Sequence, residues 1–153
     1  MKKRNSNITT EEVEARVEKF IEASRQSGMR VTHQRTEVFR ELAGCTDHPD
    51  ADTLYKRVRA RIPSISLDTI YRTLRMLEHS GAIIRVGSDQ DRAHFDANTD
   101  RHIHFICSSC GVIKDIHASS LNCIIVPESL KSLGSVDVIY IELRGTCTNC
   151  LGD

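Results

Sequence analysis

At residues 102–110 the chain reads His102-Ile103-His104-Phe105-Ile106-Cys107-Ser108-Ser109-Cys110. The alternation predicts a β-strand in which His102 and His104 point to one face and the apolar side chains between them point to the other. Two imidazoles at positions i and i+2 of a strand can bind one cation together. The Cys-x-x-Cys motif that follows offers two thiolates to a second cation, so this strand is expected to join two metal sites of different character.

A second Cys-x-x-Cys motif, Cys147-Thr148-Asn149-Cys150, lies near the end of the sequence. Together the motifs predict a closed tetrahedral site for structural zinc. Its ligands are Cys107, Cys110, Cys147 and Cys150. The alternatives are disulfides, free thiols or the redox centre of a zinc-ribbon thiol oxidoreductase. Paired motifs in intracellular proteins bind metal more often, and an oxidoreductase would need an exposed Cys-x-x-Cys of low pKa.

Length and composition favour a soluble globular protein. The 153 residues suit one compact domain or two small ones. The start of the chain is polar and carries no secretory signal, and no apolar run is long enough to span a membrane. The sequence therefore predicts a cytoplasmic location.

Charge is distributed unevenly, although the formal net charge is zero. Residues 53–85 contain seven Lys or Arg and two acidic residues, whereas residues 93–153 contain four basic and seven acidic residues. A basic N-terminal segment followed by a mildly acidic, Cys-rich one is typical of a DNA-binding module joined to a sensing module.

The N-terminal part predicts four helices and a β-hairpin. The helices begin after Thr9, Thr32, Asp50 and Ser66, and they end near Gly28, Gly44, Pro63 and Gly81. Residues 82–86 and 93–96 read as strands around the turn 87–91. This order predicts a winged helix-turn-helix whose fourth helix enters the major groove of DNA.

The fourth helix is expected to present two different faces. Its inward residues are predicted to be Leu67, Ile70, Tyr71, Leu74 and Leu77. Tyr71, Arg72 and Arg75 are candidate DNA contacts, with Asp68 also outward. Lys56 and Arg57, with Arg59 and Arg61, are either phosphate contacts or solvated helix surface, and phosphate contact is favoured because they flank the reading helix.

The C-terminal part is predicted to be a separate domain. Residues 97–101 are short and polar and read as a hinge between domains at 1–96 and 102–153. Strands are expected at 102–107 and 112–116, and residues 119–133 are weakly helical. Residues 135–144 are too apolar for a one-sided strand, so we expect a strand buried at a subunit interface. The fold class is α+β.

Several motifs in this order resemble the ferric uptake regulator family over nearly the whole chain. The matching stretches are Arg30-Val31-Thr32-His33-Gln34-Arg35, His48-Pro49-x-Ala51-Asp52-x-Leu54-Tyr55, residues 66–74, His94-Phe95-Asp96, His102-x-His104-x-x-Cys107-x-x-Cys110-Gly111 and Cys147-x-x-Cys150. The resemblance implies a dimeric, metal-dependent repressor with an N-terminal winged helix and a C-terminal α/β dimerisation domain. It implies a binding protein for double-stranded DNA and not an enzyme.

The chain is most similar to the peroxide-responsive branch of that family. This resemblance implies regulatory Fe²⁺ or Mn²⁺ bound by His48, Asp96, His102, His104 and Asp115. It also implies that hydrogen peroxide acts by oxidising a ligand histidine. The main reason is Asp115, because the iron-responsive branch usually has glutamate there. Arg72 stands where many iron sensors also have arginine, so an iron-responsive repressor is the first alternative and a zinc-responsive one the second.

Four further residues have no assigned role in the sequence. His117 follows Asp115 at i+2 and is either a ligand of a further metal site or a surface histidine, and the second is favoured. The role of His94 is left open. Cys45 and Cys123 have no partner at motif spacing and are read as small apolar residues.

Overall fold

The computed structural model describes residues 8–87, 92–117 and 127–152. The chain divides into two compact units, Met1–Thr99 and Asp100–Asp153, and the division falls inside the segment predicted to be a hinge. The predictions for the first seven residues, for the turn at 88–91, for residues 119–126 of the weak helix and for Cys123 lie outside the described residues.

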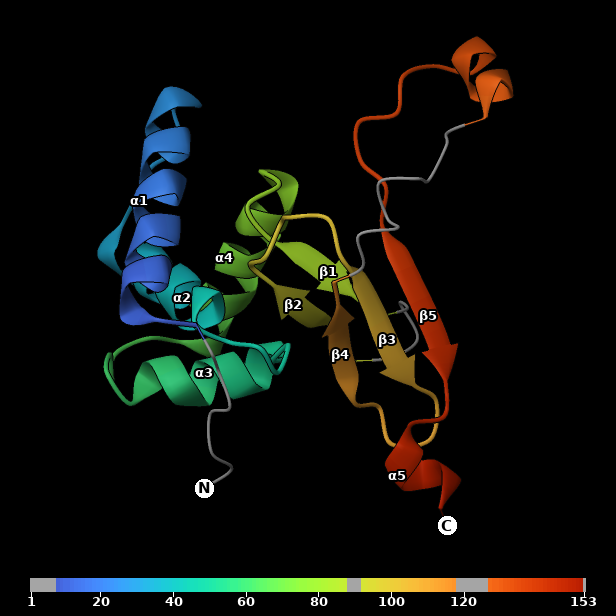
Figure 1. Cartoon of the computed structure of the whole chain (residues 1–153). Coiled ribbons are helices and arrows are strands. Elements are labelled where there is room, and N and C mark those ends of the chain that lie inside the picture. The colour runs from blue at the N-terminus through green and yellow to red at the C-terminus, as the bar shows by residue number, and fades with distance from the viewer. Residues whose placement is uncertain (1–7, 88–91, 118–126, 153) are drawn as a thin grey trace. The chain divides into compact units, whose positions relative to one another are not determined.

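Unit 1 contains the four predicted helices, α1 (Thr10–Gln26), α2 (His33–Ala43), α3 (Ala51–Arg59) and α4 (Leu67–His79) (Figure 1). Each begins after a residue whose side chain accepts a hydrogen bond from the backbone N–H three residues later, which satisfies one donor that the helix itself leaves open. These caps are Thr9, Thr32, Asp50 and Ser66, as predicted. At Thr9 the cap is a full capping box with Glu12.

Helix α3 is shorter than predicted. It ends at Arg59, and the amides of Arg61 and Ile62 both donate to the carbonyl of Val58 in a tight closing turn. Pro63 disfavours helical backbone at Ile62, the residue before it, so the helix does not resume after this closing turn.

The hairpin of unit 1 consists of β1 (Ile84–Val86) and β2 (His94–Asp96), paired antiparallel. The chain before α3 pairs with β2 as well, because Asp50 forms an antiparallel bridge with His94 and the amide of Phe95 donates to the carbonyl of Pro49 at 3.2 Å. Strand β2 is thereby held between β1 and the segment His48–Asp50. This order of four helices and a wing is the predicted winged helix-turn-helix.

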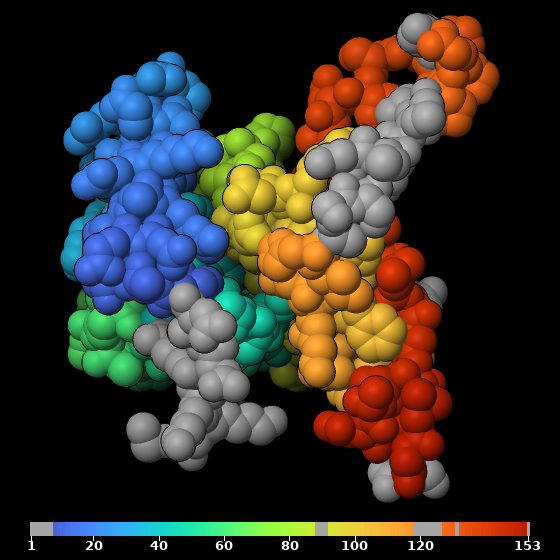
Figure 2. All heavy atoms as spheres, in the orientation of Figure 1, coloured from blue at the N-terminus to red at the C-terminus, as the bar shows by residue number. Residues whose placement is uncertain are grey.

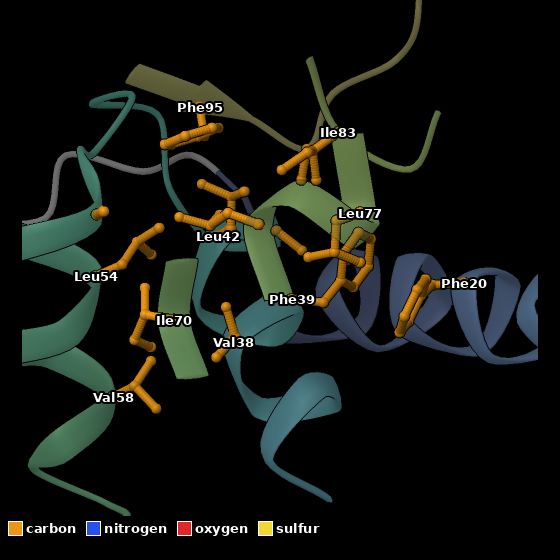
Figure 3. Packing of buried hydrophobic residues seen from close by; sticks show 14 of the residues in the cluster. Phe20, Val38, Phe39, Leu42, Leu54, Val58, Ile70, Leu77, Ile83 and Phe95 are labelled. Carbon is orange, nitrogen blue, oxygen red and sulfur yellow. The ribbon is translucent and has the colours of Figure 1, made fainter. Parts of the chain in front are cut away.

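The hydrophobic core of unit 1 is formed by the apolar stripes of all four helices together with the hairpin (Figure 3). Phe20 of α1 and Phe39 of α2 stack at 4.5 Å between ring centroids. Ile70, Leu74 and Leu77 of α4 are fully buried, but Tyr71 is 47% exposed. The prediction that Tyr71 points inward is therefore wrong, because the i, i+4, i+7 stripe of α4 begins at Ile70 and leaves Tyr71 on the neighbouring face.

Unit 2 is a three-stranded sheet in the order β4 (Ile113–Ile116), β3 (Ile103–Cys107), β5 (Ile141–Gly145). Strand β3 pairs antiparallel with β4 and parallel with β5, and the short helix α5 (Thr148–Leu151) follows β5 (Figure 1). The 3-10 helix η2 (Glu128–Ser132) precedes it. The helix-plus-sheet content confirms the α+β class.

The apolar segment predicted as a strand over 135–144 is only partly a strand. Residues 134–140 have no regular secondary structure, and pairing with β3 begins at Ile141. Val138 and Tyr140 are 59% and 63% exposed in the single chain, and their burial at a subunit interface stays a prediction. In Figure 2 the orange-red segment that follows η2 projects away from the rest of unit 2.

Within the described residues, every helix is too short or too polar to cross a lipid bilayer.

Candidate metal centres and DNA-binding face

The four motif cysteines converge at one end of the unit 2 sheet. One sulfur from each lies within 4.8 Å of every other, and Cys110 Sγ is 3.7 Å from Cys147 Sγ. None of the described cysteines forms a disulfide. Four sulfur donors at this spacing are the ligand set of a tetrahedral structural zinc site. The donors of this Cys₄ cluster are those predicted from the sequence.

The strand pairing explains how residues so far apart in sequence meet. Parallel pairing places Cys107, the last residue of β3, opposite Gly145, the last residue of β5, and Ser108 donates to the carbonyl of Gly145 at 2.7 Å. Each Cys-x-x-Cys turn thus begins at the same end of the two paired strands. Gly111 closes the first turn with φ of 72°, a left-handed conformation that glycine adopts without steric cost.

Hydrogen bonds prepare this cluster for a cation. The amide of Cys147 donates to Cys107 Sγ at 3.2 Å, and this contact and the amides of Cys110 and Ser109 lower the pKa of Cys107 to about 6. Hydrogen bonding to Cys147 and Cys110, with burial, raises the pKa of Cys150 to about 12. Four sulfurs this close cannot all ionise without a cation, and a bound Zn²⁺ would remove that conflict.

The second group of donors in unit 2 is the C-terminal donor trio, His102, His104 and Asp115. Antiparallel pairing places Asp115 of β4 directly opposite His104 of β3, so their side chains share one face of the sheet. Asp115 Oδ1 lies 3.6 Å from Nε2 of both histidines. The two Nε2 atoms are 2.9 Å apart. Adjacent ligands of one octahedral ion, each about 2.1 Å from it, lie about 3 Å apart.

A hydrogen bond orients His102 toward this arrangement. Its Nδ1–H donates to the carbonyl of Asp100 at 2.7 Å. Nε2 therefore carries a lone pair that is available to a metal, and this partner is typical of a histidine ligand. Both trio histidines are buried, and Asp115 is half-buried.

Unit 1 contributes the N-terminal donor pair, His48 and Asp96. His48 Nε2 is 3.6 Å from Asp96 Oδ2, and both residues are buried. Asp96 Oδ1 accepts a hydrogen bond from the amide of Asn98 at 2.7 Å, which leaves Oδ2 facing His48. His48 has φ of 45°, and among the described residues it is the one non-glycine residue with positive φ. Such strained backbone conformations concentrate at functional sites.

Three residues whose roles the sequence left open have defined contacts. The Nδ1–H of His94 donates to the carbonyl of His48 at 2.6 Å. The exposed ring of His117 lies 5.6 Å from the ring of His102, measured between centroids. Cys45 contacts the carbonyl of Glu41 through its thiol and accepts a hydrogen bond from Arg57 at 3.2 Å. The sequence signal that points to His94 is its i−2 spacing from Asp96 on the same strand.

The predicted reading face of α4 is exposed. Tyr71, Arg72 and Arg75 all point away from the core, and Arg72 Nε pairs with Asp68 Oδ2 at 2.9 Å. Such an exposed i, i+4 pair contributes little to stability, so Arg72 can exchange Asp68 for another partner at small cost. The exposed face therefore carries arginine side chains, a residue type that can contact base edges in a major groove.

The basic residues of α3 and of the turn after it differ from one another in their surroundings. Lys56 is exposed, whereas Arg57 makes a two-pronged ion pair with Asp47, at 3.1 and 2.5 Å. The Arg57 hydrogen bond lowers the pKa of Asp47 despite partial burial of that carboxyl group. Arg61 pairs with the buried Glu41 at 2.8 Å. These acidic partners were not identified from the sequence, because ion pairs between separate segments leave no local pattern.

Comparisons with known proteins agree with this architecture. The family model described as the ferric uptake regulator family matches residues 26–132. The peroxide-responsive repressor PerR of Staphylococcus aureus (strain USA300) is 33% identical over 146 residues, which cover 94% of this chain and 97% of that protein.

Two solved structures share the fold. The ferric uptake regulator Fur of Helicobacter pylori, described as having three functional metal-binding sites, aligns with a TM-score of 0.73 at 19% identity, over 94% of this chain and 95% of that one. PerR from Streptococcus pyogenes, solved to explain peroxide sensing and gene regulation, aligns with a TM-score of 0.51 at 26% identity, over 88% and 92%. The chain therefore belongs to the ferric uptake regulator family.

Proposed function

We propose that this protein is a peroxide-responsive transcriptional repressor that acts in the cytoplasm, binds palindromic operator DNA as a homodimer when its regulatory metal is bound, and releases the DNA when a ligand histidine is oxidised. The observation that carries the proposal is the C-terminal donor trio, in which an aspartate, Asp115, stands opposite His104. The 33% identity to the S. aureus peroxide-responsive repressor supports the same branch of the family.

In this proposal the N-terminal donor pair and the C-terminal donor trio bind one ion together. Three imidazole nitrogens and two carboxylates are donors of intermediate and hard character, which suit Fe²⁺ or Mn²⁺ better than a metal that prefers thiolates. The soft Cys₄ cluster and this mixed set therefore select different metals. One chain would hold zinc for structure and iron or manganese for regulation.

The chain positions of the donors explain how metal binding would control DNA binding. The pair belongs to unit 1, which carries the reading helix, and the trio belongs to unit 2. An ion that both units bind would limit the orientations that they can adopt. Loss of the ion would release that restraint, and the reading helices of a dimer would no longer match the spacing of two half-sites.

The peroxide response follows from ligand chemistry. A bound Fe²⁺ would activate peroxide by one-electron reduction, which Mn²⁺ does not readily do. Overall, one peroxide oxygen would add to the imidazole and the other would leave as water, with the imidazole oxidised by two electrons. The short side chain of Asp115 would leave a coordination position open to peroxide. His48 and His102 are the expected sites of oxidation, because addition of oxygen to an imidazole weakens it as a nitrogen donor. The reaction happens once per protein and involves no turnover.

The DNA-binding part of the proposal rests on the exposed face of α4. Tyr71, Arg72 and Arg75 would contact bases or phosphates in the major groove, and Lys56 would contact the backbone beside it. Arg57 is also a candidate phosphate contact, but Asp47 engages two of its five N–H donors. We therefore expect Arg57 to contribute less than Lys56.

The dimer would form along β5. This strand lies at an edge of the unit 2 sheet, and exposed apolar side chains run through it and the segment before it. They are Leu133, Val136, Val138, Tyr140 and Leu143. An apolar strand at a sheet edge favours pairing with a second strand, and a second copy of the chain would bury these residues symmetrically.

The test combines mass spectrometry with DNA binding. Full-length protein is loaded with Fe²⁺ or Mn²⁺, bound to an operator selected from random DNA, and exposed briefly to hydrogen peroxide. The iron form should gain one oxygen atom on His48 or His102 and release the DNA, and the manganese form should do neither. The peptide carrying the exposed His79 serves as an internal control and should stay unmodified.

The same experiment decides between the proposal and its main alternative. An iron form that stays on the operator with both histidines unmodified would identify an iron-responsive repressor. Arg72 agrees with that alternative, because many iron sensors also have arginine there. If Zn²⁺ alone at the mixed site supported full operator binding and Fe²⁺ did not, the zinc-responsive alternative would replace both.

A further inference from the structure

His48 needs support to hold its observed conformation. Its φ of 45° lies in the left-handed region, which a residue with a Cβ atom rarely adopts. The next residue is Pro49, and a residue before proline prefers extended backbone. A segment with two such unfavourable features keeps this geometry only if neighbouring groups hold it in place.

Strand β2 provides that support from the edge that does not pair with β1. The Nδ1–H of His94 donates to the carbonyl of His48 at 2.6 Å, and the amide of Phe95 donates to the carbonyl of Pro49 at 3.2 Å. The bridge between Asp50 and His94 completes the pairing. Of these three contacts, the hydrogen bond from His94 is made to the strained residue His48.

The spacing on β2 gives the contact its significance. His94 and Asp96 are two residues apart on one strand, so their side chains lie on the same face. One holds the backbone of His48, and the other places Oδ2 at 3.6 Å from the His48 imidazole. The two side chains therefore contact the same histidine, one at its backbone carbonyl and the other at its imidazole.

We propose that His94 is a positioning residue for the regulatory metal: it is not a ligand, but its Nδ1–H holds His48 in the left-handed conformation that directs Nε2 toward Asp96. This inference rests on the proposed metal site. Position 94 then requires one hydrogen-bond donor and not an imidazole ring as such. Groups that orient metal ligands in this way typically change metal affinity by about 10–100-fold when they are removed.

The test uses two substitutions at this position and a matched histidine elsewhere in unit 1. His94→Leu removes the donor, whereas His94→Asn keeps an N–H near the position of Nδ1. His79→Leu changes an exposed histidine at the end of α4. Mn²⁺ affinity of the full-length dimer is measured by electron paramagnetic resonance of the free ion, with zinc content and circular dichroism as checks on folding.

We expect His94→Leu to bind Mn²⁺ about 10–100-fold more weakly, while His94→Asn and His79→Leu stay within about threefold of wild type. A second measurement needs no regulatory metal. Hydrogen exchange at the Phe95 amide, which donates to Pro49, should become faster in His94→Leu and stay slow in His94→Asn. A ligand role for His94 would not predict this effect in the metal-free protein.

Three outcomes would overturn the inference. Wild-type affinity in His94→Leu would show that the donor is not needed, and equal loss in both variants would show that position 94 acts in another way. Unchanged exchange at Phe95 in a folded His94→Leu protein would show that His94 does not hold the segment. A wild type without Mn²⁺ affinity would instead overturn the proposed function, and the inference with it.

Discussion

One methylene group at position 115 separates the two leading hypotheses for this protein, a peroxide-responsive repressor and an iron-responsive one. The register of β3 and β4 places Asp115 opposite His104, with Oδ1 3.6 Å from Nε2 of His102 and of His104. A glutamate at this position would extend its carboxylate further from the strand and could occupy the position that peroxide needs. The length of one side chain would then decide whether bound iron reacts with the oxidant.

Asp115→Glu tests this directly. The variant should still bind the operator with Fe²⁺, because a carboxylate donor is retained, but the fraction of protein oxidised by a fixed peroxide dose should fall by about tenfold or more, as changes around a metal site often produce. Peptide mass spectrometry measures oxidation, and fluorescence anisotropy measures operator binding. Equal oxidation of variant and wild type would show that Asp115 does not control peroxide access.

At the scale of elements, the arginines of the α3 region and of α4 differ in the partners that surround them. Arg57 of α3 and Arg61 of the turn after it are paired with acidic residues of unit 1, so much of their charge is used in contacts with neighbouring segments. Arg72, with its side chain 80% exposed, pairs with the exposed Asp68. We therefore expect Arg72 of α4 to exchange its partner for DNA more readily than Arg57 or Arg61 would.

Arg72→Ala and Lys56→Ala should affect DNA binding differently. Loss of Arg72 should cost about 1–3 kcal/mol on the operator and little on random DNA, which is typical of a side chain that reads a base. Loss of Lys56 should weaken both, and should lower the slope of log affinity against log salt by about 1. A salt titration on both DNAs measures these effects, and an equal loss from Arg72→Ala on both would mean that it contacts only phosphate.

The Cys₄ cluster brings together the turn that follows β3 and the turn that follows β5. The hydrophobic core in Figure 3 belongs entirely to unit 1, so unit 2 depends more on strand pairing and on its metal. Metal-binding free energy in such a small unit becomes folding free energy.

Cys107→Ser and Cys150→Ser should each reduce the zinc content from about one ion per chain to a small fraction. We expect unit 2 to lose order and dimerisation to fail, while the helices of unit 1 remain, because their core is separate. Atomic absorption and backbone NMR spectra measure these outcomes. Cys45→Ser is the control and should retain zinc, and a zinc-free wild type that is folded and dimeric would contradict the structural role.

At the scale of the whole molecule, the apolar surface on and before β5 is the feature that a single chain does not explain. Tyr140 and Leu143 are 63% and 47% exposed, although a sequence this apolar would ordinarily be covered. A dimer explains it, and a two-fold dimer also presents two reading helices to a palindromic site.

Leu143→Lys and Tyr140→Asp should therefore convert the dimer into a monomer, because a charge on a strand edge opposes pairing. The monomer should bind operator DNA at least about 100-fold more weakly, since the second half-site no longer contributes to the same complex. Light scattering and fluorescence anisotropy measure the two effects. Leu151→Lys, at an exposed residue of α5, should stay dimeric, and a Leu143→Lys dimer would exclude β5 as the interface.

The sequence alone determined the features that depend on neighbouring residues. Thr9, Thr32, Asp50 and Ser66 begin helices because a cap acts within three residues, and the alternation around His104 specifies a strand in the same way. The two Cys-x-x-Cys motifs also indicated their ligands before the fold was known. The four cysteines and the order of elements could be predicted for this reason, whereas the mixed ligand set depended on resemblance to the family.

Only the tertiary structure decided the features that join distant segments. It showed that Asp115 faces His104, that Asp47 engages Arg57, that Tyr71 lies outside the core, and that His94 holds the strained backbone of His48. The pairing of β5 with β3, which joins the cysteine motifs, is of the same kind. Local propensity contains no information about which segment will pack against another, because the free energy of such contacts appears only when both segments are in place.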